Sequence, residues 1–229
     1  MTKTLVDVVR TARVLLLDFD GPVANLFAGC PAAAISEQLR ELAASQGYDL
    51  AASDMLALLR EAASHGDEQL TRLITDAARD AEAQAAESAT PTPGVVDVLA
   101  AARTSGRPVA IASNNATEAV EAYLRRLDLG GAVDLIVGRY DGMDPVLLKP
   151  HPHLVRRAIE GVNARPESLL FVGDSPSDIE AGRAAGTTTV GYANKPGKRE
   201  RLKGAGAGFV IGDMSELADA LRLAPLSMR

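Results

Sequence analysis

The sequence predicts an α/β fold in which a parallel, Rossmann-like sheet carries a small inserted α-helical cap. Two observations lead to this prediction. Short apolar runs alternate with helical stretches along most of the chain, and this rhythm breaks once, between residues 18 and 109. Alternating strands and helices favour a parallel sheet with helices on both faces. At 229 residues, the chain has the length of one such domain, or of a core domain with a modest insertion.

Short apolar runs are the predicted strands of the sheet. Runs of this length, bounded by Gly, Pro or charged residues, are typical of buried strands. They cover residues 14–18, 109–113, 133–137, 169–173, 188–191 and 209–211. Ligands of open α/β sheets bind beyond the carboxyl ends of the strands, so functional side chains are expected there.

The long interval between the first two strands is predicted to be helical. Its sequence is rich in Ala and Leu, has charges at helical spacing and contains few β-branched residues. The predicted helices cover residues 32–45, 53–63 and 68–88. A crossover of this length needs structure of its own. We therefore expect a cap domain over residues 22–91 and a core domain made of residues 1–21 and 92–229.

Composition argues against several classes of function. The formal net charge of -6 disfavours a broad surface for nucleic acid or anionic membranes. Aromatic residues make up 3% of the chain and Trp is absent, so stacking platforms for single-stranded nucleic acid are not expected. No stretch approaches the ~18 apolar residues of a membrane span, and residues 1–13 lack a signal-peptide pattern. The single cysteine, Cys30, forms no intramolecular disulfide, which favours a reducing cytoplasm.

Two pairs of aspartates follow predicted strands directly. Asp18 and Asp20 end the first apolar run, and Asp174 and Asp178 follow the fourth. Carboxylate oxygens are hard ligands of the kind that Mg²⁺ prefers. Acids at the ends of two separate strands therefore predict a shared divalent-cation site rather than a solvated surface.

Two further motifs complete a set of four along the chain. The motifs are Asp18-Phe19-Asp20-Gly21, Ser113-Asn114 after the second strand, Lys149, and Gly173-Asp174-Ser175-Pro176-Ser177-Asp178. In order and spacing this set resembles the haloacid dehalogenase-like hydrolase superfamily, over about residues 14 to 191. The resemblance is to the branch of phosphoglycolate phosphatases and β-phosphoglucomutases, many of which carry a helical cap at this insertion point. It implies the strand order 3-2-1-4-5, which brings the first and fourth strands together.

The resemblance implies a Mg²⁺-dependent phosphatase that forms an aspartyl-phosphate intermediate. In this scheme Asp18 is both the nucleophile and a metal ligand. Asp20 protonates the leaving oxygen, then activates water, and its backbone carbonyl binds the metal. Asp174 is a further direct ligand. Asp178 either orients the other ligands or binds the metal directly, and the sequence leaves this choice open.

The resemblance also assigns the residues that hold the phosphate. Lys149 places its ammonium against the nucleophile and the phosphate, and Ser113 with the backbone N–H of Asn114 binds a phosphate oxygen. Such positive groups are needed because two unit charges about 4 Å apart repel by ~4 kcal/mol at an effective dielectric of about 20. The expected partner is therefore a small phosphate monoester and the expected cofactor is Mg²⁺.

Three rival functions are weighed beside the phosphatase. A dehalogenase would not need Asp20, so this carboxylate argues against it. A phosphosugar mutase of the same superfamily also uses both Asp18 and Asp20, but transfers the phosphoryl group to a second sugar hydroxyl. Tyr48 is the only aromatic residue of the predicted cap beyond Phe27, so platforms for a sugar ring are few, which favours water as the acceptor. The third rival is a catalytically silent ligand-binding module, and the complete motif set argues against it. The leaving group and the oligomeric state, monomer or homodimer, stay open.

Three other features are interpreted more simply. The predicted cap lies between two hinges, at residues 21–22 and 90–94. Pro22 stands where the family commonly has Thr, which stiffens the first hinge and leaves the substrate open. His151 and His153 have no acidic or Cys partner nearby in sequence, so a structural role is expected. The basic run of residues 195–203 is predicted to be a solvated, mobile segment.

Overall fold

A parallel sheet of six strands forms the centre of the core, and the computed structural model describes residues 4–226 of the chain. The strands are β1 (Val14–Leu17), β4 (Val109–Ala116), β5 (Leu135–Arg139), β6 (Leu169–Gly173), β7 (Thr188–Tyr192) and β8 (Phe209–Ile211). Every pairing between them is parallel. This confirms the predicted α/β class, with β4 running three residues further than expected and β5 shifted by two.

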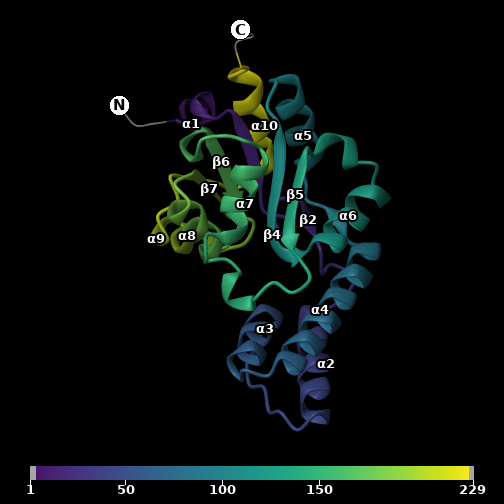
Figure 1. The fold of residues 1–229 in the computed structure, drawn as a ribbon. Coiled ribbons are helices and arrows are strands. Elements are labelled where there is room, and N and C mark those ends of the chain that lie inside the picture. The colour runs from purple at the N-terminus through teal and green to yellow at the C-terminus, as the bar shows by residue number, and fades with distance from the viewer. Residues whose placement is uncertain (1–3, 227–229) are drawn as a thin grey trace.

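The strand order is β5-β4-β1-β6-β7-β8 (Figure 1). In order along the chain this is 3-2-1-4-5, as the resemblance implied, with a sixth strand added at one edge. Chain order reverses at β1, which pairs with β4 on one side and β6 on the other. The carboxyl ends of these three strands therefore form the crevice where ligands of doubly wound sheets bind.

Helices cover both faces of this sheet. The core helices are α1 (Leu5–Thr11), α5 (Val95–Thr104), α6 (Thr117–Arg126), α7 (His153–Gly161), α8 (Pro176–Ala184), α9 (Lys198–Gly204) and α10 (Met214–Leu223). Successive side chains of a strand point to opposite faces. Leu15 and Leu17 accordingly pack with α1, α5, α6 and α10, whereas Val14 and Leu16 pack with α7 and α8. Among the described residues, no helix combines the length and the apolar character that a membrane span needs.

The helical insertion lies beyond the carboxyl edge of the sheet (Figure 1). Its helices are α2 (Ala32–Ser45), α3 (Met55–Ser64) and α4 (Glu68–Ser88), close to the predicted ranges. α3 begins two residues later than expected because Asp54 caps it, with Oδ1 accepting from the Ala57 N–H at 2.9 Å. Asp67 caps α4 in the same way, through the N–H groups of Gln69 and Leu70.

Two features join the insertion to the core. The connections pair as a short antiparallel ladder of β2 (Ala24–Asn25) and β3 (Thr90–Pro91), which the sequence analysis did not foresee. Helix α4 is longer than its neighbours in the insertion and packs against both parts. Its first half contributes Leu70 and Ile74 to the cluster shared with α2 and α3, and its last half contributes Ala85 to the core. The division at residues 22–91 stays a prediction.

One buried arginine ties the chain ends to the sheet. Arg107 donates to the carbonyls of Ala12, Val9 and Ala224 at 3.0, 3.2 and 2.6 Å, and only 3% of it is exposed. These carbonyls lie near the ends of α1 and α10, far from the carboxyl edge of the sheet.

We predict that Arg107→Met lowers the free energy of unfolding by about 1–3 kcal/mol, because it leaves buried carbonyls without donors. Urea denaturation followed by circular dichroism measures this loss. A variant as stable as the wild type would show that water or neighbouring groups replace these hydrogen bonds.

Candidate active site

One cavity of about 320 Å³ gathers all the residues that the sequence motifs singled out. They are Asp18, Asp20, Ser113, Asn114, Lys149, Asp174 and Asp178. The cavity opens at the carboxyl ends of β1, β4 and β6, where chain order reverses. Parallel pairing thus brings together residues that are far apart in sequence.

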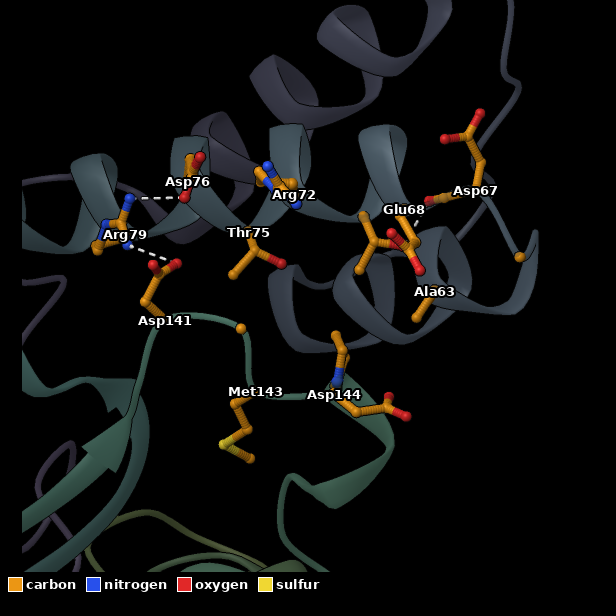
Figure 2. A pocket seen from close by; sticks show the side chains of 14 residues that line it. Ala63, Asp67, Glu68, Arg72, Thr75, Asp76, Arg79, Asp141, Met143 and Asp144 are labelled. Carbon is orange, nitrogen blue, oxygen red and sulfur yellow. Dashed lines mark hydrogen bonds and ion pairs between the residues drawn. The ribbon is translucent and has the colours of Figure 1, made fainter.

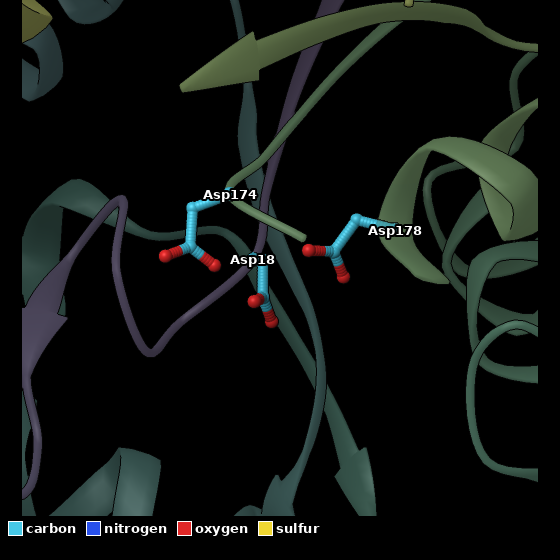
Figure 3. Close-up of side chains that lie close together, drawn as sticks. All are labelled: Asp18, Asp174 and Asp178. Atoms are coloured by element: carbon cyan, nitrogen blue, oxygen red, sulfur yellow. The ribbon is translucent and has the colours of Figure 1, made fainter. Parts of the chain in front are cut away.

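Three of the aspartates form a cluster suited to a cation (Figure 3). One carboxylate oxygen of each of Asp18, Asp174 and Asp178 lies within 4.8 Å of the others. β1 delivers Asp18, β6 delivers Asp174, and the first turn of α8 delivers Asp178. Three hard oxygen donors around one point fit Mg²⁺. The carboxylate of Asp20 lies outside this cluster, and its Oδ1 accepts from the Leu26 N–H at 3.0 Å.

Lys149 lies between two of these carboxylates. Its Nζ is 2.7 Å from Asp18 Oδ1 and 2.6 Å from Asp178 Oδ1, and donates to the Ala112 carbonyl at 3.0 Å. Only 1% of the residue is exposed. Burial disfavours the ammonium, but the charges of Asp178 and Asp18 outweigh it, so the pKa of Lys149 is raised. The lysine therefore stays charged beside Asp18.

The site holds more negative than positive charge. Burial, together with the nearby charge of Asp178, raises the pKa of Asp18 to about 7, although Lys149 opposes the shift. Burial likewise raises the pKa of Asp174. A divalent cation at this point would offset the repulsion among the three carboxylates. The donor set and its charge therefore fit the predicted metal.

The environment of Asp20 differs from that of Asp18. Burial raises the pKa of Asp20 to about 6, and the hydrogen bond from the Leu26 N–H opposes the shift without cancelling it. A carboxyl group with such a pKa exchanges its proton near neutral pH. Asp20 is thus suited to donate a proton and later accept one.

Glycine is required immediately after Asp20. Gly21 has a φ of +110°, which side-chain-bearing residues rarely adopt, and an added Cβ would lie 2.4 Å from Cγ of Asp174. The close approach of the two motif loops therefore depends on the missing side chain.

Lys198 is a site residue that the sequence analysis missed. It forms an ion pair with Asp174 Oδ2, and both side chains are largely buried. The prediction of a solvated segment over residues 195–203 is wrong at this position. Gly197, at a φ of +77°, starts α9 and turns the chain back toward the sheet. A basic residue soon after β7 was the available signal, because β7 neighbours β6.

Hydrogen bonds from side chains of the motif region itself hold Ser113 and Asn114 on β4 in place. Ser113 Oγ donates to Asn115 Oδ1 at 3.0 Å and accepts from the Asn115 N–H at 3.2 Å. The Asn114 side chain grips the backbone of Lys149: its Oδ1 accepts from the N–H at 2.8 Å and its Nδ2 donates to the carbonyl at 3.3 Å. Asn115, which also lines the cavity, was not singled out from the sequence.

The insertion closes the cavity from the opposite side. Its contribution is mainly apolar, from Phe27, Ala32, Ile35, Met55 and Leu56, with Asp54 also present. Arg60 of α3 donates to the Lys149 carbonyl at 2.7 Å, so the insertion touches the backbone of the lysine.

A larger cavity, of about 720 Å³, lies between α3, α4 and the loop after β5 (Figure 2). Arg79 crosses it, pairing with Asp76 at 2.6 Å and with Asp141 at 3.6 Å. None of the motif residues lines this cavity, so its size does not make it the site of chemistry. Neither His151 nor His153 lines the cavity of the acids, and His153 Nε2 is 3.0 Å from the Tyr140 hydroxyl.

Comparison with known proteins identifies the family. The model of the haloacid dehalogenase-like hydrolases matches residues 12–186, which include all four motifs. The chain belongs to this family. It is similar to the phosphoglycolate phosphatase of Escherichia coli strain K12, with 31% identity over 131 residues. That match covers 57% of this chain and 51% of the relative, so the chain spans about half the length of its curated relative.

Solved structures whose sequences have low identity to this chain share its fold. A predicted phosphatase from Clostridium acetobutylicum aligns with a TM-score of 0.71 at 20% identity, covering 91% of this chain and 97% of the other. A hydrolase from Pseudomonas syringae aligns with a TM-score of 0.68 at 20% identity, covering 90% and 96%. The likeness therefore extends over the insertion as well as the core.

Asp174 and Asp178, the two acids that follow β6, differ in the partners that their carboxylate oxygens already have. Asp178 is already engaged: Oδ1 pairs with Lys149, and Oδ2 accepts from the N–H and the hydroxyl of Ser175 at 3.0 and 2.6 Å. We predict that Asp174→Asn weakens Mg²⁺ binding more than Asp178→Asn does, with a loss of about 10–100-fold for the latter. Isothermal titration with Mg²⁺ measures both, and equal losses would make Asp178 a direct ligand.

Proposed function

We propose that this chain is a Mg²⁺-dependent phosphatase that hydrolyses a small phosphorylated metabolite through an aspartyl-phosphate on Asp18. The observation that carries the proposal is the pairing of a buried Asp18 with Lys149 in a cavity shared with Asp20 and a cluster of acids. The name of the Escherichia coli relative supports a phosphate monoester as the substrate. The single cysteine supports a reducing cytoplasm as the setting.

Asp18 and Asp174 are the residues that would hold Mg²⁺ directly, together with the backbone carbonyl of Asp20, and Asp178 would orient these ligands. The ion, when bound, neutralises negative charge on the phosphate and on the carboxylates around it. Lys149 adds a fixed positive charge beside Asp18. From the β4 side, the Asn114 N–H donates to a phosphate oxygen, and so does the Ser113 hydroxyl once its hydrogen turns from Asn115 Oδ1 to the phosphate.

In the first half of the reaction, a carboxylate oxygen of Asp18 attacks phosphorus. The bond between phosphorus and the leaving oxygen breaks, and that oxygen takes the proton of the Asp20 carboxyl group. The raised pKa of Asp20 means that part of the population carries this proton near neutral pH. The products of this half are the aspartyl-phosphate and a free alcohol.

In the second half, Asp20 is a carboxylate and accepts a proton from water. The water oxygen attacks phosphorus, and the bond between phosphorus and the Asp18 oxygen breaks. Inorganic phosphate leaves, and both aspartates return to their starting states. The mainly apolar lining from the insertion excludes bulk water around the leaving group during these steps.

We predict that Asp18→Asn lowers the rate of p-nitrophenyl phosphate hydrolysis by about 10⁴-fold or more, since an amide cannot replace the nucleophile. Asp141→Asn, in the other cavity, is the matched control and keeps full activity. Circular dichroism checks that both variants fold. Comparable turnover by Asp18→Asn would exclude the aspartyl-phosphate.

Hydrolysis and phosphoryl transfer to a sugar differ in the oxygen atom that accepts the phosphoryl group. In hydrolysis this atom comes from water, and in the mutase reaction it belongs to a sugar hydroxyl. We predict that turnover of phosphorylated metabolites in ¹⁸O-water releases inorganic phosphate in equal amount to the alcohol, with ¹⁸O in the phosphate. A chelator abolishes the release and Mg²⁺ restores it. Isomerised sugar phosphate with little free phosphate would instead establish the mutase.

A further inference from the structure

A buried ion pair connects helix α4 to the end of β5, the neighbour of the strand β4 that carries Ser113 and Asn114. Glu82 of α4 is fully buried, and Arg139 at the end of β5 is 2% exposed. Arg139 donates from Nη2 to Glu82 Oε2 at 2.8 Å and from Nη1 to Glu82 Oε1 at 3.3 Å. This two-point contact fixes the orientation of both side chains.

The same two side chains bind consecutive residues at the end of β4. Glu82 Oε1 accepts from Asn115 Nδ2 at 3.0 Å, and Oε2 accepts from the Ala116 N–H at 2.9 Å. Arg139 Nη1 donates to the Asn114 carbonyl at 2.9 Å. Regular pairing of β4 with β5 is interrupted between Ala112 and Ala116, so this stretch needs partners other than the strand ladder.

Of the three residues that the proposed function places at the phosphate, Asn114 contacts this pair directly, and Ser113 and Lys149 are each one residue further away. Asn115, held by Glu82, is hydrogen-bonded to the Ser113 hydroxyl. Asn114, whose carbonyl Arg139 holds, grips the backbone of Lys149 with its side chain. We propose that Glu82 and Arg139 are positioning residues that set Ser113, Asn114 and Lys149 for the phosphate, an inference that rests on the proposed function.

Energetics supports a positioning role over a purely stabilising one. Removing two charges from water costs about as much as their attraction returns, so a buried ion pair contributes little net stability. Its directional hydrogen bonds, by contrast, hold an irregular backbone segment in one conformation. Because Glu82 lies on α4, the phosphate-binding segment is also attached to a helix of the insertion.

The test compares variants of the pair with a buried arginine elsewhere. Glu82→Gln, Arg139→Lys and the double variant Glu82→Met with Arg139→Met perturb the pair, whereas Arg107→Met removes three carbonyl contacts far from the cavity. The double variant leaves no unpaired buried charge, but it removes the partners of the Asn114 carbonyl and the Ala116 N–H, so we expect its melting temperature to fall about as far as that of Arg107→Met. Inorganic phosphate, titrated in the presence of Mg²⁺, is the binding probe.

We expect each change to the pair to raise the dissociation constant of phosphate, and KM for p-nitrophenyl phosphate, by about tenfold or more. Arg107→Met should leave both unchanged while lowering the melting temperature. Partial unfolding alone reduces the active fraction, which lowers apparent kcat and spares KM.

The inference is overturned if the double variant binds phosphate as the wild type does. It is equally overturned if phosphate affinity simply follows the melting temperature across all variants, Arg107→Met included. A wild-type protein that neither binds phosphate nor hydrolyses phosphate esters would refute the proposed function instead, which keeps the two failures distinct.

Discussion

The contact between the Lys149 ammonium and the carboxylates of Asp18 and Asp178 is the interaction on which the site depends. Three carboxylates within a few ångströms repel one another strongly when buried. Lys149, placed between two of them at 2.7 and 2.6 Å, offsets part of that repulsion, and Lys198 offsets part of it at Asp174. The acids can be held this close because fixed cations lie among them, and the remaining negative charge favours a divalent ion.

The sheet brings these charges together through its topology. β1 lies between β4 and β6, so the residues that follow these strands converge although they are far apart in the chain. Two glycines allow the segments that carry the acids to come this close together. Gly21 lets the first loop pass beside Asp174, and at Gly173 an added Cβ would lie 2.2 Å from the Cβ of Asp178. A side chain at either position would separate the acids.

The insertion is joined to the core by side-chain packing and hydrogen bonds, and not only by the two connecting segments predicted to be hinges. Helix α4 carries apolar side chains into both parts, Glu82 reaches the end of β4, and Arg60 of α3 contacts the Lys149 carbonyl. A movement of the insertion would therefore act on the backbone of Ala116 and of Lys149. Apolar residues of the same insertion line the cavity opposite the acids, so under the proposed function one element would take part in both substrate choice and phosphate positioning.

The sequence by itself determined the strands of the sheet, the helices of the insertion and the seven motif residues that meet in the cavity, because strand patterns and short motifs can be recognised in the sequence itself. Which charged side chains pair with one another was decided by the tertiary structure alone. Lys198 lies at Asp174 since Gly197 turns α9 toward the sheet, and Glu82 pairs with Arg139 since α4 packs beside the end of β4. Isolated charges in a helix or a basic run carry no local signal of burial. Their function is set by what the fold packs against them, over separations in sequence that no pattern spans.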